Sequence, residues 1–196
     1  MGKNIAVFLD RDGTINEEVG YLDNPDKLKI IPTAYEAIRL INRSCMKAIV
    51  VTNQAGIARG FFTEQFVRQT HEIIQGALLQ KNASIDKFYY CPHHPTEGTG
   101  IYLQNCYCRK PLPGMLLQAA HDLNIDLKSS YMIGDTYRDM DAAKKAGVKR
   151  ILVKTGYGRE ELLDVRADVA GAENKPDFVA EDILDAVKWI MKDRIK

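Results

Sequence analysis

The stretch Ile5-Ala6-Val7-Phe8-Leu9-Asp10-Arg11-Asp12-Gly13-Thr14 decides the fold that this sequence predicts. An apolar run, rich in residues that favour strands, ends in two carboxylates, a glycine and a hydroxyl. This pattern is typical of a buried parallel strand whose carboxyl end enters a turn. Gly13 lets the backbone turn sharply, and the Thr14 hydroxyl can bond within that turn.

The two carboxylates of this stretch predict a metal site. Because side chains alternate between the faces of an extended segment, we expect Asp10 and Asp12 to point the same way. Like charges held close together repel, and a divalent cation removes that repulsion. Oxygen ligands suit Mg²⁺, and some of its coordination positions stay open to water and phosphate. Asp10 could then attack phosphorus, with Asp12 as general acid and base. Two solvated acids in a capped turn are the alternative.

Composition is that of an ordinary globular protein. Of the 196 residues, 45% are hydrophobic and 27% are charged, and the formal net charge is +1. This near-neutral balance gives no reason to expect nucleic acid or an anionic membrane as a partner. No apolar run is long enough for a membrane helix, and no signal-peptide pattern precedes the first strand. We therefore expect a cytoplasmic protein, and we expect it to be a monomer.

Strand-like and helix-like segments alternate along the chain. Strands are expected at residues 5–9, 47–52, 88–90, 131–135, 150–153 and 177–179. Helices are expected at residues 32–43, 63–80, 113–123, 139–146 and 183–191. Repeated βα units predict a Rossmann-like three-layer α/β/α fold around a mainly parallel sheet. Residues 1–196 are expected to form one domain with a loop insertion at about 91–110. Gly156-Tyr157-Gly158 is interpreted as a loop, and residues 159–175 carry no motif.

Polar residues follow several of these strands. In a parallel sheet the site lies outside the carboxyl ends of the strands, and Asp10, Thr52 and Asp135 all fall there. The Thr52 hydroxyl and the amide after it can donate to phosphoryl oxygens, although a threonine that bonds its own turn is an alternative. Asp135 is a candidate metal ligand. Asp139, one helical turn later, could ligate, bind a metal-bound water or cap the following helix.

Cysteines and histidines cluster in the irregular segment. Cys91-Pro92-His93-His94 and Cys106-Tyr107-Cys108 offer the sulfur and nitrogen ligands that suit tetrahedral zinc. Four protein ligands would make a closed, structural site, and we expect Cys91, His93, Cys106 and Cys108 to be these ligands. His94 is the alternative to His93, which is preferred because one spacer then separates the ligands in each half.

The remaining cysteine and histidines have no motif around them. Cys45, at the end of a predicted helix, is expected to be a small buried apolar residue rather than a ligand. His71 and His121 lie on helical patterns, and we interpret both as structural.

The chain resembles the haloacid dehalogenase-like (HAD) phosphohydrolase superfamily in a series of motifs. In order, these are Asp10-x-Asp12, Thr52, Lys110, and Gly134-Asp135 with Asp139. The Cys-Pro-His-His-Pro and Cys-x-Cys-Arg-Lys-Pro-x-Pro-Gly-Met segments are similar to the zinc-bearing D-glycero-D-manno-heptose 1,7-bisphosphate 7-phosphatases. So is Thr-Asn-Gln-Ala-Gly-Ile-Ala-Arg-Gly at residues 52–60. The likeness runs from about residue 4 to 158. Histidinol-phosphate phosphatases share the scaffold and a similar zinc loop, and they are the nearest alternative.

The resemblance implies an Mg²⁺-dependent sugar bisphosphate phosphatase without a large cap domain. Such an enzyme removes the 7-phosphate through an aspartyl-phosphate, in the synthesis of nucleotide-activated heptose for lipopolysaccharide core or a related glycoconjugate. Asp10 would be the nucleophile and Asp12 the general acid and base. The implied magnesium ligands are Asp10, Asp12 and Asp135, with Asp139 as a possible contact to a metal-bound water.

The resemblance also implies a set of substrate contacts. Thr52 and Lys110 would hold the transferring phosphoryl group, and Arg109 would contact the substrate. Arg59 is a candidate contact to the second phosphate, because guanidinium matches phosphate geometry. The sugar pocket would be lined by Glu18, Val19, Gly20, Tyr21, Asn53, Gln54 and Ala55.

Two alternatives come from other classes of protein. Receiver-like phosphoacceptor signalling domains also combine acids, Mg²⁺, a threonine or serine and a lysine on a parallel sheet. Their accepting aspartate lies on a middle strand, not two residues before a general acid on the first. A zinc-ribbon module that binds nucleic acid or protein is the other alternative, and the near-neutral charge and the strand-end acids argue against it.

Overall fold

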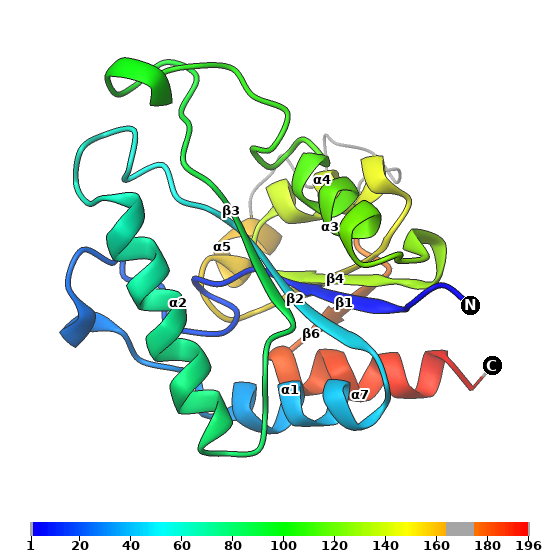
Figure 1. The fold of residues 1–196 in the computed structure, drawn as a ribbon. Coiled ribbons are helices and arrows are strands. Elements are labelled where there is room, and N and C mark those ends of the chain that lie inside the picture. Colours follow the sequence, from blue (N-terminus) through cyan, green and yellow to red (C-terminus); the bar gives the residue numbers. More distant parts are fainter. Residues whose placement is uncertain (1, 164–174, 196) are drawn as a thin grey trace.

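Six parallel strands form the centre of the protein (Figure 1). The computed structural model describes residues 2–163 and 175–195. Within them the sheet has the order β3-β2-β1-β4-β5-β6, and each neighbouring pair is parallel. The predicted fold class is confirmed. The strands are β1 (Ala6–Leu9), β2 (Lys47–Asn53), β3 (Lys87–Cys91), β4 (Tyr131–Gly134), β5 (Lys149–Val153) and β6 (Phe178–Ala180).

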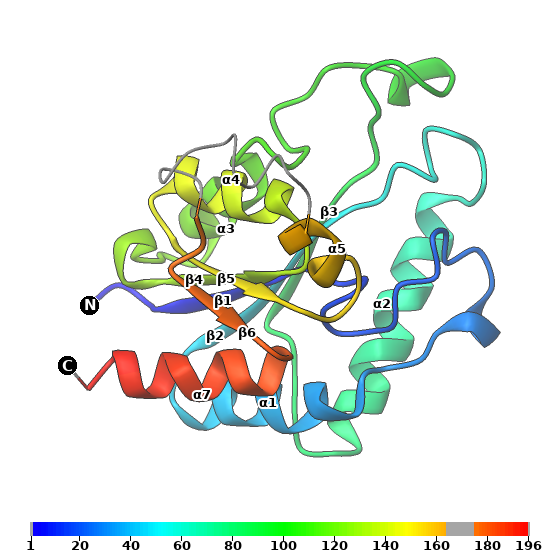
Figure 2. The ribbon, with the colours of Figure 1, turned by 180° about the vertical axis from the view of Figure 1, so that it is seen from behind.

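Helices cover both faces of this sheet (Figures 1 and 2). The α-helices are α1 (Pro32–Arg43), α2 (Glu64–Leu79), α3 (Gly114–Asp122), α4 (Tyr137–Ala146), α5 (Gly158–Leu163) and α7 (Ile183–Asp193). The short 3-10 helices are η1 (Pro25–Lys27), η2 (Gly100–Tyr102) and η3 (Leu127–Ser129). In both views α1 and α7 lie side by side below the sheet, with α3 and α4 on the other side.

Alternation along the buried strands divides the core in two. Val7 and Leu9 of β1 face the cluster formed with α1, α2 and α7, whereas Ala6 and Phe8 face the cluster formed with α3 and α4. All four residues are fully buried, as expected for a central strand of a sheet covered on both faces. The hydrophobic run that predicted this strand therefore also joins the two layers of helices.

Most predicted elements are present, and the differences have local causes. The helix predicted at residues 32–43 is found as α1 (Pro32–Arg43). Helix α4 begins at Tyr137, two residues before the predicted start, because Thr136 and Asp139 form a capping box. The segment interpreted as a loop at residues 156–158 leads into α5, which was not predicted. Of residues 159–175, which carry no motif, 164–174 lie outside the described residues.

Cys45 corrects one expectation about burial. Its side chain is exposed, not buried. The residue follows the end of α1 with a φ of 57°, and this left-handed turn directs the side chain to solvent. His71 is buried and stacks on Phe88 with ring centroids 4.5 Å apart, whereas the side chain of His121 is 86% exposed.

Across the described ranges 2–163 and 175–195, every helix is too short or too polar to cross a membrane.

Candidate active site

Three aspartates meet at the carboxyl ends of β1 and β4. Asp10 follows β1, Asp135 follows β4, and Asp139 lies in the first turn of α4. One carboxylate oxygen from each lies within 4.8 Å of the other two. The Nζ of Lys110 lies 2.8 Å from Asp10 Oδ1 and 2.6 Å from Asp139 Oδ1. The topology of the sheet thus gathers residues that are far apart in the sequence.

The group contains three carboxylates and one lysine, so negative charge is in excess when all of them are ionised. Burial raises the pKa of Asp10 to about 7, although Lys110 opposes the shift, and the charge of Asp139 adds to it. Burial and the charges of Asp10 and Asp139 raise the pKa of Asp135 to about 9. Burial disfavours a charged Lys110, but the same two carboxylates outweigh it and raise the pKa of the lysine. A bound cation would relieve the remaining repulsion between the acids, so these oxygens fit a magnesium site.

Asp12 lies outside the group of three aspartates, although it was expected to share the metal ion with Asp10 and Asp135. β1 ends at Leu9, so the alternation of an extended strand does not reach Asp12. Its Oδ2 accepts from Arg11 Nη2 at 2.7 Å and from Gln54 Nε2 at 3.0 Å. Burial opposes ionisation, but the Arg11 guanidinium holds the pKa of Asp12 below its usual range. Asp12 still lines the same cavity as Asp10.

Three polar residues follow one another at the end of β2, namely Thr52, Asn53 and Gln54. The Thr52 hydroxyl accepts from Gln54 Nε2 at 2.9 Å, so its own hydrogen remains available for a further acceptor. The Asn53 side chain donates to the backbone carbonyl of Lys110 at 2.9 Å and accepts from the backbone N–H of Lys110 at 3.0 Å. The backbone of Lys110 is therefore held on both sides by one amide.

Glycines make room for the carboxylates. Gly13 has a φ of 77° and Gly156 a φ of 55°, and a Cβ at either would lie 2.1 Å from Asp135 Oδ2. The backbone N–H of Tyr157 donates to the same Oδ2 at 2.9 Å. Gly13 was expected to serve the turn, and the structure adds that it leaves space for Asp135.

Two adjoining cavities open at this end of the sheet. The first, of about 450 Å³, is lined by Asp10, Thr52 and Lys110. The second, of about 260 Å³, is lined by Gln54, Ala55 and Arg109. Of the predicted sugar-pocket residues, the first cavity is lined by Glu18, Gly20 and Asn53. The second is lined by these three residues and by Tyr21, Gln54 and Ala55.

Val19 and Arg59 depart from the expected pocket. Val19 is 39% exposed and lines neither cavity. Arg59 also lines neither: its Nη2 pairs with Glu97 at 2.9 Å, and its Nη1 donates to the Tyr21 hydroxyl. The expected contact between Arg59 and a second phosphate is therefore not supported, because the guanidinium already has an anionic partner outside the cavities.

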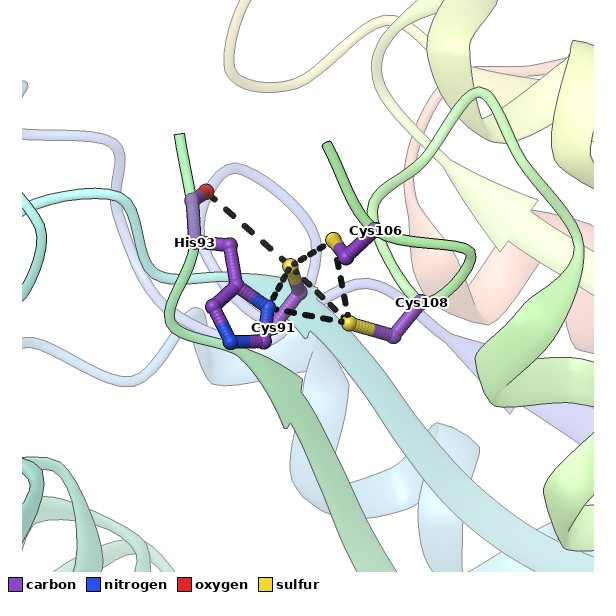
Figure 3. A group of neighbouring side chains, drawn as sticks. All are labelled: Cys91, His93, Cys106 and Cys108. Carbon is purple, nitrogen blue, oxygen red and sulfur yellow. Dashed lines mark hydrogen bonds between the residues drawn. The ribbon is translucent and has the colours of Figure 1, made fainter. Parts of the chain in front are cut away.

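The predicted soft ligands form a second cluster beside this site (Figure 3). The three sulfur atoms of Cys91, Cys106 and Cys108 lie 3.3 to 3.4 Å apart. His93 Nδ1 lies 3.4 Å from Cys108 Sγ and 3.8 Å from Cys91 Sγ. Sulfur ligands about 2.3 Å from a zinc ion at tetrahedral angles would lie about 3.8 Å apart. The four donors fit that arrangement within a few tenths of an ångström.

His94 lies outside the cluster. Its Nδ1 accepts from the backbone N–H of Glu97 at 2.9 Å. The cluster is connected to the active site by the chain itself, since Arg109 and Lys110 directly follow Cys108. Arg109 Nη1 also donates to the carbonyl of His93 at 3.2 Å. Arg109 is therefore held at the wall of the second cavity by the segment that contains His93 and by the segment that contains Cys106 and Cys108.

Comparison with known proteins agrees with this geometry. Residues 107–186 match the HAD-hydrolase-like family model. The D-glycero-beta-D-manno-heptose-1,7-bisphosphate 7-phosphatase of Pasteurella multocida is 43% identical over 94% of this chain and 96% of that protein. The protein of the same name in Escherichia coli K12 is 41% identical over 98% of this chain and 97% of that protein. The chain belongs to the D-glycero-beta-D-manno-heptose-1,7-bisphosphate 7-phosphatase family.

A solved structure supports this family assignment. The D,D-heptose 1.7-bisphosphate phosphatase from B. bronchiseptica, complexed with magnesium and phosphate, matches with a TM-score of 0.83. It is 32% identical in sequence, and the match covers 96% of this chain and 99% of that chain. This member of the heptose-bisphosphate 7-phosphatase family is thus a phosphoric monoester hydrolase with a HAD-like fold.

Several residues at the site of this family member were not predicted. Gly156 and Tyr157 contact Asp135, and Arg138 and Tyr157 line both cavities. The paired glycines of Gly156-Tyr157-Gly158 were the available signal, because glycine is common where backbone approaches a ligand or another side chain. Arg138 carried no signal: an arginine in the first turn of a helix is ordinary.

Proposed function

We propose that this chain removes the 7-phosphate of D-glycero-beta-D-manno-heptose 1,7-bisphosphate. The observation that carries the proposal is the convergence of Asp10, Lys110 and Asp135 on one cavity. The names of relatives about 40% identical over nearly the whole chain support the choice of substrate.

Asp10 is the nucleophile of the proposed reaction. Its carboxylate attacks the 7-phosphorus, the bond from phosphorus to the sugar oxygen breaks, and an aspartyl-phosphate forms. Lys110 Nζ donates to the carbonyl of Val51 at 2.8 Å in addition to its two carboxylate contacts, so it is held rigidly beside the reacting oxygen. The free hydrogen of Thr52 and the charge of Lys110 stabilise the transferring phosphoryl group.

Asp12 moves the protons. It gives a proton to the departing sugar oxygen, and it later takes one from the water that hydrolyses the aspartyl-phosphate. That water releases phosphate and restores the Asp10 carboxylate. The contacts of Asp12 with Arg11 and Gln54 favour its ionised form, which is the form that accepts a proton in the second step.

Two metals complete the proposal. Asp10, Asp135 and Asp139 would hold Mg²⁺, which supplies positive charge against the acids and the phosphate when it is bound. Cys91, His93, Cys106 and Cys108 would hold a structural Zn²⁺. We further propose one domain, a monomer and a cytoplasmic location, as well as a role in nucleotide-activated heptose synthesis.

Phosphate release tests the proposal. With Mg²⁺ present, we expect faster release from heptose 1,7-bisphosphate than from histidinol phosphate, and loss of turnover in Asp10→Asn. Asp26→Asn is the matched control, because that exposed residue lines neither cavity. Faster release from histidinol phosphate would favour that alternative substrate. A long-lived phosphoprotein without turnover would favour a receiver-like domain.

A further inference from the structure

Four cationic side chains line the two cavities, and two of them have no carboxylate partner among the described residues. Lys110 pairs with Asp10 and Asp139, and Arg11 pairs with Asp12 at 2.7 Å. Within the described residues, the side chain of Arg109 donates only to the backbone carbonyl of His93. Arg138, in the first turn of α4, is exposed, and its side chain has no hydrogen bond or ion pair in residues 2–163 and 175–195. These two arginines are therefore available to an anionic ligand.

The two cavities differ in charge. Acidic side chains dominate the wall of the first, where Glu160 and Glu161 add to the aspartates. In the second, cationic residues outnumber acidic ones, because Arg11, Arg109 and Arg138 face only Asp12 and Glu18. An anionic group that is not held at Asp10 would therefore be repelled from the first cavity and attracted to the second.

Arg138 lies where the cavities join. Six residues belong to both walls: Asp12, Glu18, Gly20, Asn53, Arg138 and Tyr157. Arg138 is the cationic residue of this shared wall. A substrate that places one phosphate at Asp10 would therefore extend past Arg138 toward Arg109.

We propose that Arg138, together with Arg109, binds the distal, non-reacting phosphate of a bisphosphate substrate and so sets a preference for bisphosphates over monophosphates. This inference rests on the proposed phosphatase function. Guanidinium groups present paired N–H donors that match phosphate oxygens. Arg138 is a specificity residue here, since it lies at the border of the two cavities rather than beside the attacking oxygen.

The test compares two substrates, heptose 1,7-bisphosphate and the same heptose with only its 7-phosphate. The readout is the ratio of their kcat/KM values in the full chain. We expect Arg138→Gln to lower this ratio roughly tenfold, mainly through the KM of the bisphosphate, and Arg138→Lys to restore part of it. Lys188→Gln, which removes an exposed charge on α7 outside both cavities, should leave the ratio unchanged.

The outcomes separate this inference from the proposed function. An unchanged ratio in Arg138→Gln, or an equal loss on both substrates, overturns the role of Arg138 and leaves the phosphatase assignment intact. A wild-type chain that hydrolyses both substrates equally overturns recognition of the distal phosphate. A wild-type chain that hydrolyses neither overturns the proposed function and this inference with it.

Discussion

Asn53 shows how a single side chain can position the active site. Its amide makes two hydrogen bonds to the backbone of Lys110, from the end of β2 to the segment after the cysteine cluster. Asn42, at the end of α1, makes the same pair of bonds to the backbone of Ser84. The two asparagines therefore provide a matched comparison of a site contact with a structural one.

We predict that Asn53→Ala lowers kcat roughly 10- to 100-fold, because Lys110 loses the contacts that fix its backbone. Asn42→Ala should instead cost about 1–3 kcal/mol of unfolding free energy and leave kcat within about twofold. Steady-state kinetics and urea unfolding of both variants make the comparison. Equal losses of kcat in the two variants would contradict a positioning role for Asn53.

Gly156 is a residue whose missing side chain matters. A Cβ there would lie 2.1 Å from Asp135 Oδ2, whereas at Gly147 no atom would lie within 4 Å. Both residues have a positive φ, so alanine strains the backbone by about 1–2 kcal/mol at either position. We predict that Gly156→Ala lowers kcat about 100-fold by displacing Asp135. Gly147→Ala should lower stability alone, as measured by kinetics and thermal unfolding of the pair.

At the scale of elements, the segment between β3 and α3 is held from two sides. Beyond the cysteine cluster, Tyr102 of η2 donates to Glu64 Oε1 at 2.7 Å at the start of α2. Tyr90 of β3 donates to the other oxygen of Glu64 at 2.5 Å. These contacts join the segment to α2, and the cluster joins its two ends to each other.

We predict that Cys106→Ser loses bound zinc and lowers kcat/KM at least tenfold, because Arg109 and Lys110 follow the cluster directly. Cys45→Ser is the control: Cys45 is exposed and lies outside the cluster. Metal content by mass spectrometry and phosphate release report the two effects. A Cys106→Ser protein that retains one equivalent of zinc would argue against this ligand set.

The local sequence pattern predicted the bounds of an element well where a clear start or stop signal was present. The span of α1 was predicted correctly because a proline begins the helix and an apolar face runs along it. The end of β1 at Leu9 was also predicted correctly, because the apolar run stops there and is followed by acids and a glycine. Helix α5 is six residues long and begins at a glycine, so its local signal was weak.

For the whole molecule, His71 connects stability to pH. The residue is 6% exposed, its Nε2 has no hydrogen-bond partner, and burial lowers its pKa to about 3. The unfolded chain binds a proton near the ordinary histidine pKa of about 6.5, whereas the folded chain does not until about pH 3. Stability is therefore lost as the pH falls through this window, by about 2 kcal/mol at pH 5.

We predict that His71→Phe removes this part of the acid sensitivity. The difference in unfolding free energy between pH 7.5 and pH 5 should shrink by about 2 kcal/mol, as measured by urea unfolding. His121→Gln is the control, because the side chain of His121 is 86% exposed. If His71→Phe keeps the full pH dependence of the wild type, His71 is not the group responsible.

The order of apolar and polar residues along the chain was enough to predict a parallel sheet covered on both faces. It was also enough to place Asp10, Thr52 and Asp135 at one edge of that sheet, and to predict the four soft ligands. These features follow from spacing within single segments, where strand and helix periods act directly. Periodicity carries no information about side chains beyond the strand ends.

Folding decides which charged side chains are paired and which can contact a substrate. Lys110 pairs with Asp10, 100 positions away, and Arg59 is occupied by Glu97. Arg138 remains without a partner in the described chain and lines both cavities. Such pairings depend on distances between segments that only the packed sheet and its loops bring together. For that reason a motif could identify the reacting aspartate, whereas the arginines that face a substrate had to be found in three dimensions.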